Sequence, residues 1–227
     1  MEQLSGNLEK DRRRLDELLG VGRNFDVINR DVEIGGRRGR VYVIDGYGDD
    51  GVIERIFSFL LGDGALLAAK ARSMQELSDT CLTFSEVNCE REIEKILSGA
   101  FLGKTVLLLE GFTDCVLIDA KQFPGRNVEE PANGKVLRGS HDGFVEAMVP
   151  NMALLRRRIR DPRLTMEGMK VGSRSKNDAV LCYLDDRVDP AALEELRGKL
   201  RAIQARSLSM GQESVAEAIR PKQWYNP

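Results

Sequence analysis

The sequence of 227 residues is poor in the side chains from which metal and redox centres are built. It holds one histidine, His141, and four cysteines that form no CxxC pair and no zinc spacing. The cysteines are Cys81, Cys89, Cys115 and Cys182. Such scattered cysteines are typical of buried, reduced thiols in a cytosolic protein, because a free cysteine packs as a small hydrophobe. We therefore expect no disulfide framework, no metal site and no cofactor.

Long apolar runs and an excess of charge of one sign are also missing. The 34 Lys and Arg residues nearly balance the 36 Asp and Glu residues, and aromatic residues make up only 6% of the chain. Binding of nucleic acid needs basic surface or stacking rings, so we expect no nucleic-acid partner. The best apolar candidate for a membrane span, Ile56 to Ala69, is interrupted by Gly62, Asp63 and Gly64. The charged N-terminus lacks the apolar core of a signal peptide.

Common catalytic and phosphate-binding motifs are absent as well. The sequence contains no GxxxxGK[ST] and no GxGxxG after a strand. The glycines between Gly46 and Gly51 have three Asp neighbours, which would repel an anion at the helix that follows. Ser140, His141 and Asp142 are neighbours, whereas a working triad is assembled from separate elements whose side chains face one another. We therefore expect a protein that is not an enzyme.

What the chain does contain is a succession of short strands and amphipathic helices. Helical periodicity predicts a first helix over Leu4 to Leu19, which either packs on its own domain or docks to a partner protein. The other expected elements are strands over Val27 to Ile34, Arg40 to Ile44, Val106 to Glu110, Val116 to Asp119, Leu164 to Val171 and Ala179 to Leu184, and helices over Val52 to Leu61, Ser73 to Leu77, Glu90 to Leu97, Met148 to Arg160 and Pro190 to Ile203.

A weak internal repeat indicates two α/β lobes. Two segments, one in each half, read as strand, basic turn, strand, acidic turn and helix, with Ile34-Gly35 corresponding to Val171-Gly172. The alternative is chance similarity between common hairpin–helix units. The polar stretch from Phe123 to Lys135 resembles a linker or a crossover between the lobes.

The strongest charge cluster runs from Arg156 to Arg160. At 100° per residue its four arginines spread around three sides of a helix, whereas a nucleic-acid stripe would keep them on one face. The first interpretation is solvated flanks with ion pairs to acidic residues, namely Glu129, Glu130, Asp142 or Glu146. The alternative is that part of the run lines a cleft between the lobes and meets an anionic ligand or partner.

Two long segments resemble a known family. The first is GAFLGKTVLLLEGFTDCVLIDAKQFPGRNVEEP, from Gly99 to Pro131, and the second is VLRGSHDGFVEAMVPNMALLRRRIRDPRL, from Val136 to Leu164. Within the second segment the family pattern is carried by Arg138-Gly139, Gly143-Phe144-Val145-Glu146, Asn151, Leu154, Arg156, Arg158 and Asp161-Pro162-Arg163-Leu164. This ordered string is similar to the N-terminal soluble domain of the GerA family, the A subunits of bacterial spore germination receptors.

The resemblance covers most of the chain and is weakest before about Asn24. The entry segment from Asn24 to Val27 and the C-terminal segment from Gln223 to Pro227 look most like the stage V sporulation branch of the family. The chain departs from the pattern at Ser140, where members usually carry Pro. His141 is not a family hallmark, which argues further against a special role for it.

The resemblance implies a two-part molecule, in which a cytosolic head of about this length precedes a multi-pass membrane domain. The full-length protein would then lie in the spore inner membrane with its head facing the spore core. Its partners would be other spore germination membrane subunits, and the membrane domain would form a homo-oligomer that conducts ions. Heads of the family are similar in fold to small-molecule-binding proteins with two α/β lobes.

We therefore expect an α/β fold of two lobes, each a small mixed sheet with flanking helices, plus an amphipathic N-terminal helix. The expected divisions are residues 1–22 for the helix, 23–133 for the first lobe, and 134–227 for the second lobe with a linker to the membrane domain. The expected function is assembly and signal coupling to the membrane domain. The alternative is a module that senses a small polar molecule between its lobes. The residues expected to contact a ligand or partner are Arg138, Glu146, Asn151, Arg156 and Arg158.

Overall fold

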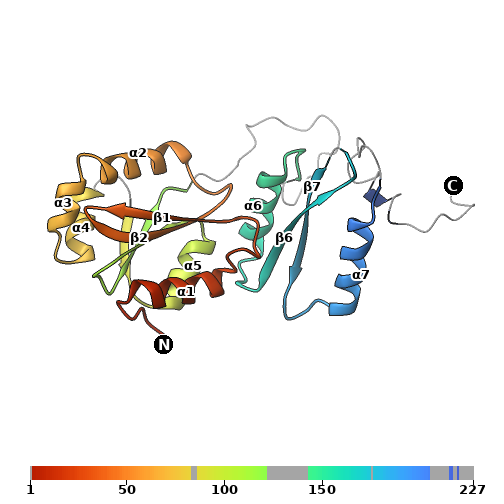
Figure 1. Cartoon of the computed structure of the whole chain (residues 1–227), viewed down its shortest axis with the longest axis horizontal. Helices are drawn as coiled ribbons and strands as arrows, with labels where there is room; N and C mark the ends of the chain where they lie inside the picture. Colours follow the sequence, from red (N-terminus) through yellow and green to blue (C-terminus); the bar gives the residue numbers. More distant parts are fainter. Residues whose placement is uncertain are drawn as a thin grey trace, which may run out of the picture. The chain divides into compact units, whose positions relative to one another are not determined.

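The structure, a computed structural model, divides into two compact units. Unit 1 contains Met1–Gly22 and Asp26–Pro162, and unit 2 contains Arg23–Phe25 and Arg163–Pro227. The chain therefore passes from unit 1 to unit 2 and back before its last crossing after Pro162 (Figure 1). The residues that the structure describes are 2–82, 86–121, 143–174, 176–204, 215–216 and 219.

Unit 1 is built on a five-stranded sheet whose ladders are all antiparallel. Its strands are β1 (Val27–Ile34), β2 (Arg37–Ile44), β3 (Glu86–Glu90), β4 (Thr105–Leu109) and β5 (Cys115–Asp119). Their order in space is β1-β2-β4-β5-β3, so β4 is the central strand and β1 and β3 are the edges.

The central strand β4 explains why unit 1 carries helices on both faces of its sheet. All five of its residues, TVLLL, are buried. Val106 and Leu108 belong to one apolar core, whereas Leu107 and Leu109 belong to the other. Because successive side chains of a strand point to opposite faces, a continuous apolar run has to be covered on both sides.

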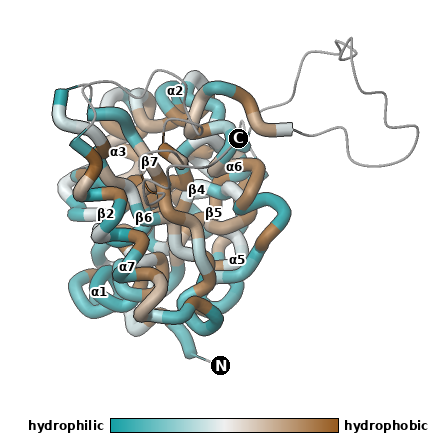
Figure 2. Tube along the Cα trace, turned by 90° about the vertical axis from the view of Figure 1, so that its right-hand side faces the viewer, coloured by the Kyte–Doolittle hydropathy of each residue, from teal (hydrophilic) through white to brown (hydrophobic). Residues whose placement is uncertain are grey.

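Two helices pack on one face of this sheet and three on the other. The first pair is α1 (Leu8–Leu19) and α5 (Ile93–Phe101), and the second group is α2 (Asp50–Leu61), α3 (Ala65–Lys70) and α4 (Met74–Cys81). Figure 1 shows α1 and α5 on the opposite side of the sheet from α2. Helix α1 is amphipathic, and its largely teal trace in Figure 2 reflects a surface dominated by charged residues. Helix α6 (Met148–Arg158) also belongs to unit 1.

Helix α1 begins at Leu8, four residues later than its periodicity predicts. Asn7 is the N-cap, and its side chain accepts a hydrogen bond from a backbone N–H of the first turn. The buried carboxylate of Asp11 accepts bonds from the N–H groups of Ser5 and Gly6 at 2.8 and 3.0 Å. A side chain of the helix thus holds the preceding residues in a turn outside it.

Unit 2 contains, in its described part, a two-stranded antiparallel sheet and one long helix. Strands β6 (Leu164–Val171) and β7 (Asn177–Leu184) pair along their whole length. Helix α7 (Pro190–Arg201) has Asp189 as its N-cap and Pro in its first turn, as the sequence predicts. Its core is made by Val171, Leu200 and Ile203.

The short segment Arg23–Phe25 is tied to β6. The N–H of Phe25 donates to the carbonyl of Met166 at 2.7 Å, and the N–H of Met166 donates to Asn24 Oδ1 at 2.9 Å. The ring of Phe25 lies so close to Gly168 that an added Cβ would come within 2.4 Å of it. These contacts explain why three residues far away in the sequence belong to unit 2.

The internal repeat is confirmed at the level of secondary structure. β1, β2 and α2 in unit 1, and β6, β7 and α7 in unit 2, each form an antiparallel hairpin followed by a helix. The equivalent residues Ile34 and Val171 end the first strand of each hairpin and are both buried. Each is followed by a glycine with positive φ.

The predicted α/β class and N-terminal helix are confirmed, but some details differ. Both sheets are antiparallel instead of mixed. The β1–β2, β4–β5 and β6–β7 pairs are hairpins, which require antiparallel strands, and the non-consecutive pairs β2–β4 and β3–β5 are antiparallel too. α3 is too short to show a helical period. β3 alternates polar and apolar residues as a half-buried strand does, with Val87 and Cys89 packed on the core, but it is not among the predicted strands. The expected boundary between residues 133 and 134 and the crossover from Phe123 to Lys135 lie outside the described residues. Helix α6, expected in the second lobe, belongs to unit 1.

The loop between β1 and β2 consists of two glycines, Gly35 and Gly36, with φ of 61° and 76°. Positive φ at both positions is type I′ geometry, which suits the twist of a hairpin. Of the two glycines, only Gly35 packs closely against another element, helix α3. A Cβ added to it would lie 2.5 Å from the nitrogen of Ala69 and 2.6 Å from the carbonyl oxygen of Ala65, in α3, whereas nothing lies within 4 Å of one added to Gly36.

Gly35→Ala is expected to unfold the protein at a lower urea concentration than Gly36→Ala. Both variants place a Cβ at positive φ, which costs about 1–2 kcal/mol. Gly35→Ala adds a collision with the backbone of α3, which costs about 1–3 kcal/mol more. Circular dichroism during urea unfolding measures both free energies. Equal values for the two variants would contradict the close packing of this turn against α3.

Candidate functional site

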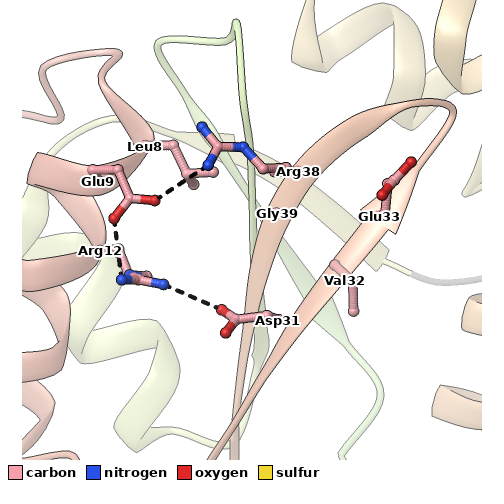
Figure 3. Close-up of a pocket in the computed structure, with 8 residues that line it drawn as sticks. All are labelled: Leu8, Glu9, Arg12, Asp31, Val32, Glu33, Arg38 and Gly39. Atoms are coloured by element: carbon pink, nitrogen blue, oxygen red, sulfur yellow. Dashed lines mark ion pairs between the residues drawn. The ribbon is translucent and has the colours of Figure 1, made fainter.

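A charged hollow of about 410 Å³ lies in unit 1 between α1 and the β1–β2 hairpin (Figure 3). It is lined by Leu8, Glu9 and Arg12 from α1, by Asp31, Val32 and Glu33 from β1, and by Arg38 and Gly39 from β2. The lining thus contains three carboxylates and two guanidinium groups, so the hollow carries an excess of negative charge.

A chain of ion pairs runs across the hollow from β1 through α1 to β2. Nitrogens of Arg12 lie 3.6 Å from an oxygen of Asp31 and 3.1 Å from an oxygen of Glu9. A nitrogen of Arg38 lies 3.7 Å from the other oxygen of Glu9 (Figure 3). Water and salt screen such exposed pairs, so they orient the side chains more than they stabilise the fold.

Glu33 takes no part in an ion pair within the described residues. It lies directly opposite Arg38 in the β1–β2 ladder, but Arg38 donates hydrogen bonds to Glu110 at 2.8 and 3.1 Å instead. These bonds hold the pKa of Glu110 below its ordinary value. Figure 3 shows Arg38 directed toward Glu9 and away from Glu33. The exposed carboxylate of Glu33 is therefore available at the rim of the hollow.

Arg40 links the hollow to the body of unit 1. Its side chain is buried and donates hydrogen bonds to Asp31 at 2.9 Å and to Asp16 at 3.2 Å. Its guanidinium lies 5.6 Å from the centre of the Tyr42 ring. The hydroxyl of Tyr42 donates to the carbonyl of Arg12 at 3.2 Å, and burial raises the pKa of Tyr42. Strand β2 and helix α1 are thus joined by polar contacts as well as by apolar packing.

The side chains of the hollow can recognise a partner, and among its lining residues the candidate nucleophiles are the carboxylates of Glu9, Asp31 and Glu33. None of the lining residues is Ser, Thr, Cys, His or Lys. In the part of the chain that the structure describes, no three His, Cys, Asp or Glu residues are grouped so as to hold a metal ion. Carboxylates and guanidinium groups bind complementary charge and hydrogen-bonding groups, so the hollow is suited to recognition.

Of the five residues expected to contact a ligand or partner, the four that the structure describes do not line this hollow. Arg138 lies outside the described residues, and Glu146 and Arg158 are exposed. The side-chain amide of Asn151 accepts a bond from the N–H of Val145 at 2.8 Å and donates one to its carbonyl at 2.7 Å. Asn151 therefore ties the segment before α6 to that helix.

Arg156 is buried completely against Asp26. Its Nε and Nη2 donate to the two carboxylate oxygens of Asp26 at 2.5 and 2.9 Å, and the exposed fractions of the two side chains are 0% and 1%. The guanidinium also lies 4.9 Å from the centre of the Phe101 ring. This bidentate ion pair gives each of the two buried charges the oppositely charged partner that it requires. It joins α6 and α5 to the residue that precedes β1.

The solvated position expected for the arginine run is wrong for Arg156, which is buried and pairs with a carboxylate 130 residues away in the sequence. A signal was available, because Met148, Met152 and Arg156 follow one another at intervals of four residues on one side of α6. Arg156 thus lies on the same side of α6 as the buried Met152. No local pattern identifies Asp26 as its partner, because the spacing of residues within a segment does not indicate which distant residue they contact.

Comparison with known proteins decides the family. Residues 13–227 match the family described as Bacillus/Clostridium GerA spore germination protein. The chain belongs to the GerA family. It is 34% identical over 224 residues to stage V sporulation protein AF of Bacillus subtilis (strain 168), which covers 97% of this chain and 44% of that protein. It is 28% identical over 192 residues to spore germination protein KA of the same organism, over 83% of this chain and 35% of that protein.

A solved structure shares the fold. The N-terminal domain of the A subunit of the Bacillus megaterium spore germinant receptor GerK3 superposes with a TM-score of 0.72 at 22% identity, over 98% of this chain and 83% of that one. The predicted membership of the GerA family is thus confirmed, and the similarity to stage V sporulation protein AF agrees with the predicted branch. This GerA chain spans less than half the length of the two curated relatives. Among its described residues, no helix has the length and apolarity needed to cross a membrane.

Arg156→Met is expected to lower the free energy of unfolding by about 3–5 kcal/mol, because it leaves Asp26 as a buried charge without its partner. Arg160→Met is the matched control, since Arg160 is exposed and should change stability by at most about 0.5 kcal/mol. The double variant Asp26→Leu with Arg156→Met should recover most of the loss. Urea unfolding followed by circular dichroism measures all three. A stable Arg156→Met protein would contradict the assigned pair.

Two buried tyrosines make stability fall at high pH. Burial raises the pKa of Tyr47 to about 12 and also raises that of Tyr42. In the unfolded chain tyrosine ionises near pH 10, so the folded state holds these protons more tightly. The contribution is complete below about pH 10 and is lost as the pH approaches 12. We expect the urea midpoint to fall over this range, and to fall less in Tyr47→Phe. An unchanged pH dependence in that variant would argue against the role of Tyr47.

Proposed function

We propose that this chain is the cytosolic head of a spore germination membrane protein and works without catalysis. In this role it assembles with other germination subunits and passes a conformational change to an ion-conducting membrane domain. The head faces the spore core, and the full-length protein lies in the spore inner membrane. Homo-oligomerisation runs through the membrane domain.

The observation that carries this proposal is the family match over residues 13–227, together with the fraction of the relatives that the chain covers. Stage V sporulation protein AF aligns with almost all of this chain but is more than twice as long. The structural neighbour is itself an N-terminal domain of a receptor subunit. A head of this kind has to recognise other proteins, and the charged hollow offers groups suited to recognition.

Sensing of a small polar molecule by Arg138, Glu146, Asn151, Arg156 and Arg158 stays a prediction. The contacts of Asn151 and Arg156 favour the assembly role, because both side chains are engaged inside unit 1. A thermal-shift screen of amino acids, sugars and nucleotides would reveal a specific ligand through a raised melting temperature.

A chimera in Bacillus subtilis tests the coupling role. The 227-residue chain replaces the aligned 44% of stage V sporulation protein AF, and spores are scored for ion release and loss of optical density after nutrient addition. We expect the chimera to germinate like the parent strain and a version without the head to germinate like the deletion strain. The fold-disrupting Arg156→Met variant should behave like the headless version, and Arg160→Met like the chimera. Parental germination by the headless protein would contradict coupling through this domain.

A further inference from the structure

The outer side of β1 is an open strand edge beside the charged hollow. β1 is an edge strand of eight residues, and within the described residues no backbone hydrogen bond reaches its outer side. An edge of this length can pair with another extended segment unless it is blocked. Asp31, Val32 and Glu33 of this strand also line the hollow, so the open edge and the hollow form one surface.

The register of the hairpin shows which backbone groups point outward. In a hairpin with a two-residue loop, the closing pair, Ile34 and Arg37, is hydrogen-bonded, and hydrogen-bonded and non-hydrogen-bonded pairs then alternate. Glu33 and Arg38 are therefore a non-hydrogen-bonded pair. In agreement, the carbonyl of Arg38 accepts a bond from Glu110 on the far side of β2.

Asn29, Asp31 and Glu33 accordingly direct their N–H and C=O groups away from β2. Because side chains alternate along a strand, Asp31 and Glu33 also lie on one face of the sheet. Asp31 keeps 66% of its side chain exposed, and Glu33 has no ion pair among the described residues. An added strand would thus meet two carboxylates at alternate positions along its own length.

We propose that the outer edge of β1 binds an extended segment of a partner protein that carries Lys or Arg at alternate positions. The backbone of the segment adds a sixth strand to the sheet, and its basic side chains pair with Asp31 and Glu33. Leu8 supplies an apolar wall to the hollow, against which the aliphatic stem of a Lys or Arg side chain can pack. The excess of carboxylates over guanidinium groups in the hollow fits a basic occupant.

A second copy of β1 fits this edge poorly. In an antiparallel pair the outward-facing residues oppose one another. The registers that pair nearly the whole strand then place Asp31 opposite Asp31, or Arg30 opposite Arg30. Like charges at directly opposed positions destabilise a strand pair. The charges therefore favour a different, basic partner segment.

The biological meaning of this edge rests on the assembly role proposed above, but its test needs no germinating spore. The probe is a seven-residue peptide of alternating lysine and valine, N-methylated along one edge so that it cannot assemble with itself. Binding to the 227-residue chain is measured by fluorescence anisotropy. Amide hydrogen exchange with and without the peptide locates the contact. We expect exchange to slow at Asn29, Asp31 and Glu33.

Two variants separate charge from strand addition. Glu33→Lys should weaken peptide binding by about tenfold or more, because it places like charge opposite the peptide. Asn29→Pro should weaken peptide binding similarly, because proline lacks the outward N–H that would bond to the peptide. The N–H groups that form the β1–β2 ladder belong to other residues and are kept. The matched control is Glu86→Lys, which makes the same charge change on the other edge strand, β3, and should leave binding within about twofold.

Several results would overturn the proposal. These are absence of binding, exchange that slows elsewhere than β1, or equal weakening by Glu86→Lys and Glu33→Lys, which would indicate non-specific attraction. Self-association of the chain through β1, seen by light scattering as a dimer that Glu33→Lys dissolves, would replace the basic partner with a second copy. Glu33→Lys alters an exposed residue without an ion pair among the described residues, so it keeps the test decisive even where Asn29→Pro fails to fold.

Discussion

Unit 1 depends on the burial of β4 from both faces. A strand of five buried residues in the middle of the sheet needs an apolar cover on each side, and the two helical layers provide it. The charged hollow follows from this requirement. Helix α1 has to lie on the sheet to shield one core, and in doing so it brings Glu9 and Arg12 next to β1. On the opposite face, α3 lies against the hairpin turn, which explains why Gly35 has no space for a side chain.

The two groups of ion pairs in unit 1 serve different purposes. The pair of Asp26 and Arg156 is closed to water, so its geometry is fixed and its loss is costly. The pairs around the hollow are open to water, add little stability and can exchange partners at small cost. A fixed pair suits the framework that holds α6 in place. Exchangeable pairs suit a binding surface, because a charged group of another molecule can take the place of one member of the pair.

Local patterns were sufficient to predict much of the fold. The β1–β2 hairpin and the cap at Asp189 depend on neighbouring residues, and both are found, although β2 begins at Arg37, three residues earlier than predicted. The partner of Arg156 could not be predicted, because 130 residues separate it from Asp26. The hollow could not be predicted for the same reason. It gathers residues from three elements, and the spacing of residues in the sequence does not reveal how those elements pack. The open edge of β1 could not be predicted either, because it depends on the strand order, in which β4 and not β3 lies next to β2.

The three residues from Arg23 to Phe25 have a consequence for how such proteins can be recombined. They complete unit 2, although the chain on both sides of them belongs to unit 1. A single genetic exchange near Pro162 would therefore transfer β6 without the Asn24 side chain that accepts the N–H of Met166. A hybrid with one junction would have the relative's own residues at these three positions, whereas one that also exchanges the tripeptide keeps the Asn24–Met166 bond of this chain.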